Sequence, residues 1–365
     1  MKKLLLILLL CPLFVTSCRA EGLMEQAAAQ TGAAQVEQAL PEAERQISGP
    51  LRLDGGYDTD GALKRLWTRL ADKARESFNE SLRHAVSLLG LSAVSALAGS
   101  LCRDKNVGAF AEQCSCCAAA LLLAGSVESV IGQASQALSL LSDYSHAALP
   151  AIYTAAAVSG AAVSAPARYA AASLVMDLMI SAQLHLILPL VFAYLAAAVS
   201  KSLFDNGILR ALCRLLKWSV TKGLTGITLG FSAYLSLTTL VTGSVDAVAV
   251  KTARTVLSTV LPVVGGILSD SASTLLSAAA LIKNSVGAFS LMAVLALCAG
   301  PFAVLSVKLL LFKSTAAATE LLAGARLSQL VGELGTCFGM LLGMVGSCGI
   351  MLFLSIMAGI KVVSA

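Results

Sequence analysis

Long apolar segments dominate the chain after residue 84, and they are continuous rather than alternating. Continuous runs of this kind favour α-helices over the strands of a β-barrel, in which lipid-facing and lumen-facing residues alternate. Each run is near the length that a helix needs to cross a hydrocarbon core of ~30 Å. The pattern therefore predicts an all-α, polytopic helical membrane protein with about six to seven transmembrane segments in a membrane domain over 84–365. The candidate segments are residues 85–101, 109–131, 149–165, 174–199, 223–243, 286–311 and 334–360.

The first twenty residues, MKKLLLILLLCPLFVTSCRA, combine two lysines, a short apolar core and small residues near the end. This arrangement predicts an export signal peptide over 1–20. The letters VTSC also resemble a lipoprotein box that would end at Cys18, and cleavage after Ala20 is the competing interpretation. In either case the following segment, residues 21–83, is expected on the outer side of the membrane.

One amphipathic helix is predicted within this segment, over residues 62–82. Apolar residues recur there at spacings of three and four, which is the period of a helix face. The helix is expected to lie on an anionic membrane surface, to dock on a partner, or to pack on the protein's own membrane domain. Its apolar face holds Leu63, Leu66, Trp67, Leu70, Ala74, Phe78 and Leu82, and its other face holds Lys64, Arg65, Arg69, Lys73 and Arg75.

Basic residues between the segments predict the topology. The connection 201–222 carries five Lys or Arg against one Asp, and Arg103 and Lys105 flank an earlier turn, so the positive-inside rule puts both in the cytoplasm. An odd number of crossings cannot join two cytoplasmic loops, so we expect 149–165 to be re-entrant or interfacial. The C-terminus is then expected outside.

The region 246–287 combines charges with helix-breaking residues inside the most hydrophobic part of the chain. A charge at the centre of a membrane helix costs about 2.5–3.5 kcal/mol, so such residues normally face a protein interior or a wet cavity. Pro and paired Gly predict a break between two half-helices, and the alternative is an amphipathic connection on the membrane surface. The candidates for lining a conduit are Asp246, Lys251, Arg254, Asp270, Lys283 and Asn284. The break is assigned to Pro262, Gly265 and Gly266, and a close helix approach to Gly287.

The last predicted span carries Gly335, Gly339 and Gly343 at four-residue intervals. Small residues repeated in this way let two helix backbones approach closely. The stripe is therefore expected to pack against another helix, either inside the protein or between subunits.

Composition supports a membrane protein and gives no chemistry for an enzyme. Hydrophobic residues make up 57% of the 365 residues and charged residues 13%, against about 25% charged in soluble domains. The formal charge of +5 is too small to predict nucleic-acid binding. Cys114 and Cys117 form a C-x-x-C without a second ligand pair, so we expect no metal and no cofactor. Asp177 and His185 could share one helix face, either as a helix contact or as a proton relay.

The stretch VDAVAVKTARTVLSTVLPVVGGILSDSASTLLSAAALIKNSVGAF resembles the signature region of the stage III sporulation protein AE family. Weaker support comes in order around it: LPAIYTAAAVSGAAVSAP, LILPLVFAYLAAAVSKSL and LGTCFGMLLGMVGSCGIMLFLSIMAG. The similarity covers about 85–365, whereas the part before it matches only in general character.

This resemblance implies an integral-membrane component of the channel or transport assembly that links mother cell and forespore. It implies a multi-pass location in the mother-cell-derived outer forespore membrane and an oligomer within a complex. The implied partners are other stage III sporulation proteins of the same operon, including an ATPase and ring-forming proteins, and stage II sporulation protein Q, together with membrane lipid. The alternatives are a stand-alone secondary transporter with a site at the broken helix, or a membrane scaffold without a conduit.

Overall fold

The computed structural model describes residues 32–51, 57–101, 105–161, 164–204, 206–242, 265–323 and 325–361, and all regular structure within these ranges is helical. The predicted signal peptide and the lipoprotein box at Cys18 lie outside the described residues. Five helices are long and apolar enough to cross a membrane, so the described part of the chain is that of a helical membrane protein. The five are 59–98, 110–159, 164–203, 280–322 and 326–361.

Two short helices, α2 (Ala33–Gln38) and α3 (Glu42–Ser48), precede the bundle. Tyr57 fixes the chain that follows them, because its hydroxyl donates to the carbonyl of Ser48 and its ring meets Phe289 edge-on at 6.1 Å. These contacts hold the polar N-terminal part of the described chain on the side of the bundle.

Two very long helices form the first hairpin. Helix α4 (Thr59–Leu101) has 43 residues and contains both the predicted amphipathic helix and the first predicted span. Helix α5 (Lys105–Ala156) has 52 residues and continues through Pro150 into a π-turn at Ala157–Ala161. The predicted segments 109–131 and 149–165 are therefore joined by helical residues and do not form two separate crossings.

The next hairpin begins with α6 (Ser164–Ala182), a π-turn at Gln183–Ile187 and α7 (Leu188–Leu203), which together make one helical rod. Pro189 lacks the N–H group that would bond the carbonyl of His185, which accounts for the irregular turn there. Helix α8 (Gly207–Thr242) then returns beside α7.

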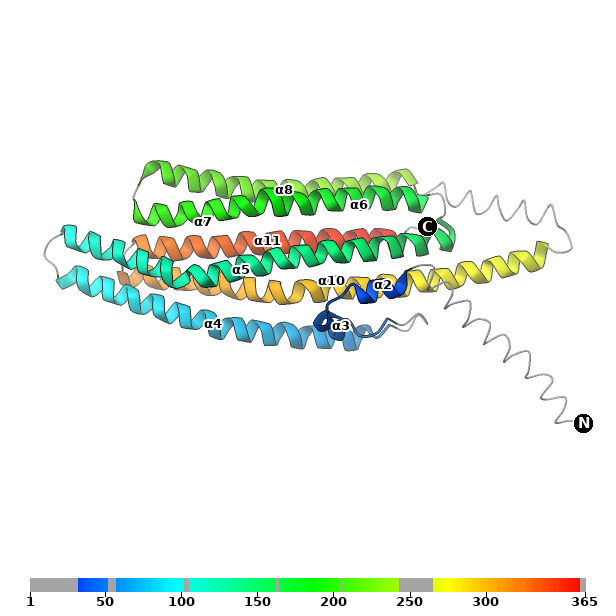
Figure 1. The fold of residues 1–365 in the computed structure, drawn as a ribbon, viewed down its shortest axis with the longest axis horizontal. Coiled ribbons are helices and arrows are strands. Elements are labelled where there is room, and N and C mark those ends of the chain that lie inside the picture. The colour runs from blue at the N-terminus through cyan, green and yellow to red at the C-terminus, as the bar shows by residue number, and fades with distance from the viewer. Residues whose placement is uncertain are drawn as a thin grey trace, which may run out of the picture.

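Helices α10 (Gly265–Ala323) and α11 (Ala325–Lys361) form the centre of the bundle. Helix α10 packs on α11, α4 and α5, and α11 also contacts α7 and α8. In Figure 1 the α6–α8 layer lies above α11 and α4 lies below α10, while α5 runs alongside the pair. Each is much longer than the ~20 residues needed to cross a bilayer, so the bundle extends beyond the hydrocarbon core.

The two basic connections predicted from the sequence lie at one end of the bundle, together with the junction of α10 and α11. The ends of α4, α7 and α10 and the starts of α5, α8 and α11 share the left end in Figure 1, while α11 ends at the right. Only α5 and the α6–α7 rod separate the first two turns. Two helical passes can join two loops on the same side. The fold therefore avoids the odd number of crossings that the sequence analysis found, and it needs no re-entrant segment to do so.

Helix α4 buries only part of the apolar face that its sequence pattern indicates. Over residues 62–82 the fully buried residues are small or hydroxylated, namely Ala62, Ser77 and Ser81, while Leu66 and Leu70 are half-buried. Trp67, from the predicted apolar face, is 71% exposed, and Leu63, Phe78 and Leu82 are exposed as well. Close packing of two helix backbones through small residues explains why α10 accepts this face.

Candidate functional site

The structure describes only part of the predicted conduit lining. Asp246, Lys251, Arg254 and Pro262 lie outside the described residues. Gly265 and Gly266 are the first two residues of α10, and Asp270 lies in the same helix, although its side chain is outside the described part.

The two remaining lining candidates differ in their surroundings. Lys283 is 3% exposed and lies against the interior of the protein, whereas its neighbour Asn284 is exposed. Residues adjacent on a helix point in directions about 100° apart, so these two side chains do not line one surface. The described part of 246–287 therefore contains one buried cation, Lys283, rather than a continuous row.

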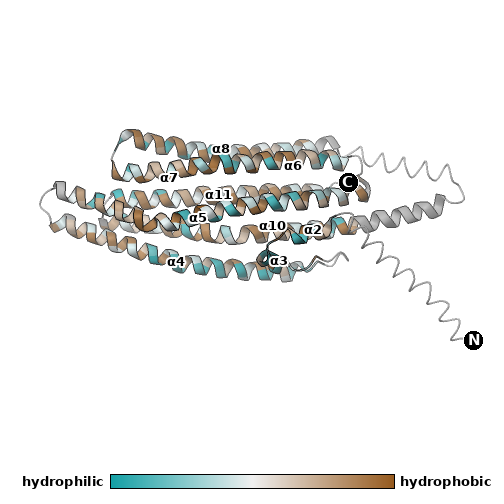
Figure 2. Ribbon diagram, viewed as in Figure 1, coloured by the Kyte–Doolittle hydropathy of each residue, from teal (hydrophilic) through white to brown (hydrophobic). Residues whose placement is uncertain are grey.

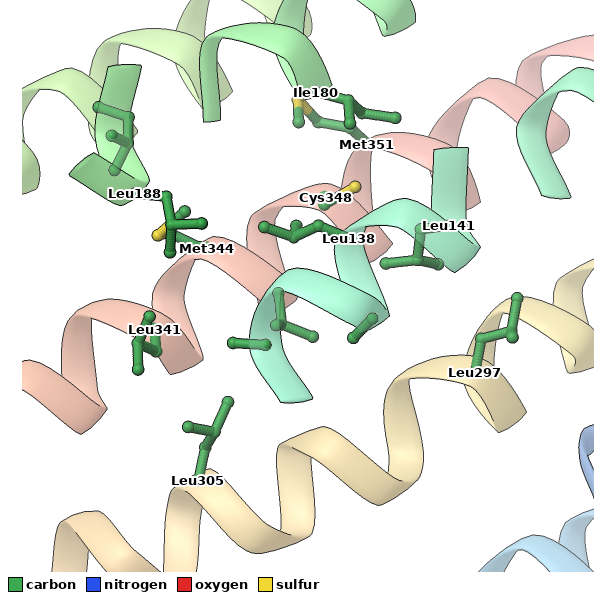
Figure 3. Packing of buried hydrophobic residues seen from close by; sticks show 14 of the residues in the cluster. Leu138, Leu141, Ile180, Leu188, Leu297, Leu305, Leu341, Met344, Cys348 and Met351 are labelled. Atoms are coloured by element: carbon green, nitrogen blue, oxygen red, sulfur yellow. The ribbon is translucent and has the colours of Figure 1, made fainter. Parts of the chain in front are cut away.

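The middle of the bundle is filled with apolar side chains. Figure 3 shows Leu138 and Leu141 of α5 meeting Met344 and Cys348 of α11, with Leu297 and Leu305 of α10 nearby. Protein interiors packed in this way leave few voids larger than a water molecule. An aqueous path does not run between these residues.

The first charged cluster inside the bundle joins α4, α5 and α10. Lys308 of α10 is 2% exposed, and its ammonium donates to Glu80 Oε1 at 3.0 Å and to Ser126 Oγ at 3.1 Å. His84 Nε2 lies 3.9 Å from the same Glu80 oxygen. A buried lysine needs such partners, because an unpaired charge in this position loses its hydration without compensation.

A second charged cluster joins α7 and α11. Lys201 Nζ lies 2.8 Å from Glu333 Oε1, and the Tyr194 hydroxyl donates to the other oxygen of Glu333. Lys313 of α10 donates to the carbonyl of Gly332 and to Thr336 Oγ1, both at 2.7 Å. Glu333 therefore links α7 to α11, and Lys313 separately links α10 to α11, close to the end with the basic turns.

The end with the basic turns carries a third set of polar contacts. The backbone N–H of Arg326 donates to Glu112 Oε1 at 3.0 Å, and its guanidinium Nε lies 3.8 Å from Oε2. Gln113 Nε2 donates to the carbonyl of Leu203 at 2.6 Å. The end of α7 is thus level with the eighth or ninth residue of α5, and the start of α5 extends about 12 Å further along the helix axis.

Asp177 and His185, which could share a helix face, do not pair with each other. Asp177 Oδ1 lies 3.4 Å from Nε2 of His146 on α5 instead. His185 Nδ1 lies 3.3 Å from Ser181 Oγ and 3.1 Å from the Ser181 carbonyl in its own helix. The contact of His185 is therefore local, and the contact between helices uses His146, which no sequence pattern singled out.

The C-x-x-C cysteines stand apart from other metal ligands. Cys114 and Cys117 are free and exposed on α5, with the free and buried Cys116 between them. Within the described ranges no three His, Cys, Asp or Glu side chains come together as a metal site would require.

The glycine stripe of α11 packs against helices of the same chain. A Cβ at Gly335 would lie 3.2 Å from the Lys313 side chain, one at Gly339 would lie 3.5 Å from Leu309, and one at Gly343 would lie 2.8 Å from Leu224. A Cβ at Gly287 would overlap the side chain of Ile360. These glycines permit close approach of α11 to α10 and α8.

A charged surface runs along α4 next to an apolar groove. Leu66 and Leu70 of α4 face the groove, which has a volume of about 400 Å³ and is otherwise lined by α10 and α11. Figure 2 shows the hydrophilic residues of α4 concentrated in its half nearest α3. We call the exposed charges of residues 64–83 the α4 charged face: Lys64, Arg65, Arg69, Asp72, Arg75, Glu76, Glu80 and Arg83.

The comparisons with known proteins agree on one family. The model of the family described as stage III sporulation protein AE matches residues 56–362, which include every helix from α4 onward. Stage III sporulation protein AE of Bacillus subtilis (strain 168) is 22% identical over 204 residues, or 56% of this chain and 51% of that protein. The chain thus spans about half the length of this curated relative. No solved structure matches the chain. The chain belongs to the stage III sporulation protein AE family.

Proposed function

We propose that the protein is an integral-membrane component of a channel or transport assembly between mother cell and forespore, required during stage III of endospore development. The observation that carries this proposal is the family match over 56–362, which covers the whole described bundle from α4 to α11. The five long apolar helices and the basic turns at one end support a fixed orientation in a membrane. The proposed membrane is the outer forespore membrane.

The filled centre of the bundle bears on how such an assembly would be built. Because α5, α10 and α11 meet through apolar side chains, a single described bundle has no room for an aqueous path through its middle. We therefore assign the conduit to surfaces between this chain and other chains. The proposed neighbours are further copies, the ATPase and ring-forming proteins of the same operon, and stage II sporulation protein Q.

The same observation favours a second candidate function. A membrane scaffold that recruits partners but bounds no conduit would also have a solid centre and polar clusters that fix helix register. The two candidates differ in whether charged residues of the region 246–287 are needed for activity.

Neutralising two of these charges separates the candidates. In an endospore-forming host, Lys251→Met with Asp270→Asn should lower the heat-resistant spore count towards that of the deletion strain if the protein lines a conduit. A matched variant, Glu42→Gln with Lys222→Met, removes one anion and one cation at exposed positions elsewhere and should sporulate normally. Immunoblots must show equal protein amounts. Normal sporulation of both variants would favour the scaffold, and normal sporulation of the deletion strain would contradict both candidates.

A further inference from the structure

The polar half of α4 lies at the same depth as an apolar part of α10. Leu66 and Leu70 share their groove with Leu295 and Phe302 of α10 and with Ile350 of α11. Further along, Ser77 Oγ donates to the carbonyl of Val304 at 3.5 Å, and Glu80 pairs with Lys308. Residues 66–80 of α4 therefore run beside residues 294–308 of α10, which lie inside the most apolar of the five candidate membrane spans.

At this depth one part of the bundle surface is apolar and another part is charged. Leu295, Phe302 and Ile350 are 40%, 44% and 55% exposed, as expected for side chains that meet lipid. The α4 charged face lies at the same level. Apart from Glu80, which reaches Lys308 at its edge, the face points away from α10, because α4 turns Ser77 and Ser81 towards the bundle. Charged side chains at membrane depth face a protein interior or water, so lipid cannot cover this face.

We propose that the α4 charged face bounds a water-filled space at membrane depth and that this space admits small anions. That the space forms part of a transport path rests on the function proposed above. The proposal places residues that contact water on α4, in addition to those predicted from the sequence in the region 246–287.

The preference for anions follows from how the carboxylates are paired. Lys308 lies 3.0 Å from Glu80, and Lys73 lies 2.8 Å from Glu76, so two of the three carboxylates on the face are matched by lysines outside it. Arg65 lies 3.9 Å from Asp58, and the remaining Lys64, Arg69, Arg75 and Arg83 outnumber Asp72. Rings or rows of Arg and Lys are the usual lining of anion pathways.

Cysteine labelling of the full-length protein in sealed membranes tests whether water reaches the α4 charged face. Thr68 and Asn79 are exposed, uncharged residues among the charges, so Thr68→Cys and Asn79→Cys leave the face intact. We expect both to react with a membrane-impermeant thiol reagent. The matched variants Leu295→Cys and Ile350→Cys should react only after detergent is added. Peptide mass mapping identifies the labelled residue, so the native cysteines stay in place.

The charge of the reagent tests the anion preference. At Thr68→Cys and Asn79→Cys, an anionic methanethiosulfonate should gain roughly tenfold in rate over a cationic one at low salt, relative to the ratio measured with free glutathione. The gain should shrink as salt increases, because exposed charges are screened. Equal relative rates at both positions would overturn the anion preference.

Two results would overturn the water-filled space. One is that the α4 cysteines react only in detergent. The other is that Leu295→Cys and Ile350→Cys react as readily as the α4 variants, because the whole level would then lie outside the membrane. The labelling does not depend on sporulation, so normal sporulation of a deletion strain would reject the proposed function and leave this result standing.

Discussion

At the scale of single residues, the charges inside the bundle are matched across helices rather than within them. Lys308 pairs with Glu80, which lies 228 positions away in the sequence, and Lys201 pairs with Glu333, which lies 132 positions away. The sequence pattern assigned Lys201 to a basic connection and Glu80 to an amphipathic helix, so it predicted neither their position inside the bundle nor their partners. The pairs depend on how helices distant in sequence pack together.

Removing Glu80 tests whether its pairing with Lys308 stabilises the bundle. Glu80→Ala leaves the buried ammonium with Ser126 alone, so the free energy of unfolding should fall by about 1–3 kcal/mol. Adding Lys308→Met should recover most of the loss, because an apolar side chain of similar size needs no partner. Thermal unfolding in detergent measures all three proteins.

A second pair on the same helix provides the control. Lys73 and Glu76 lie 2.8 Å apart, but both side chains are exposed. Exposed pairs contribute little, so Glu76→Ala should change the free energy of unfolding by less than about 0.5 kcal/mol. Equal losses for Glu80→Ala and Glu76→Ala would show that the buried lysine finds another partner.

At the scale of helices, the sequence predicts their existence better than their extent. Period and hydropathy locate α10 and α11 well, because their apolar runs fill the predicted spans. They divide α5 into two segments, because Glu128 and the polar residues before Pro150 look like a connection although the helix continues through them. Helical hydrogen bonding does not stop at polar residues, so hydropathy boundaries differ from helix boundaries.

The apolar face of α4 is divided between contact and exposure for a related reason. An apolar stripe normally indicates the buried face of a helix in water, but in a membrane protein the surface can be as apolar as the core. Leu66 and Leu70 line the groove against α10 and α11, whereas Trp67 of the same face is exposed. The apolar pattern thus indicates the helix and only part of the side that packs.

Two glycines of α10 allow the close helix contact to be separated from helix propensity. Both Gly287→Ala and Gly300→Ala should gain up to about 1 kcal/mol from helix propensity. A Cβ at Gly300 meets no atom within 4 Å, whereas one at Gly287 overlaps Ile360 of α11. The Gly287 variant should therefore be less stable than the Gly300 variant by about 1–3 kcal/mol in thermal unfolding. Equal stability would show that Ile360 moves aside without cost.

At the scale of the whole molecule, the order of the spans could be predicted from the sequence, but their relative positions along the bundle axis could not. Basic residues predict which two connections face the cytoplasm, and in the structure both lie at the same end as the junction of α10 and α11. The contacts Gln113–Leu203 and Glu80–Lys308 show, however, that the α4–α5 hairpin is shifted along the bundle relative to the other helices. Such a shift depends on packing between helices distant in sequence. It brings the α4 charged face to the level of apolar α10, which no local pattern could indicate.

The shared end of the basic turns leads to a definite topology. If lysines and arginines hold these turns in the cytoplasm, alkaline phosphatase fused after Leu101 or after Asn206 should be inactive, because the enzyme matures only outside the cytoplasm. The same reporter fused after Ala161 or after Lys361 should be active, since both positions lie at the opposite end in Figure 1. The fusions after Ala161 and Asn206 form the sharpest pair, because one helical rod and its short connections separate them.

Equal activity of this pair would mean that the α6–α7 rod does not cross the membrane. If all four fusions gave the opposite of the expected activity, the protein would have the reverse orientation in the membrane. In the expected orientation the α4 charged face begins outside and descends towards the cytoplasm beside α10, which is the direction that a path across one membrane requires.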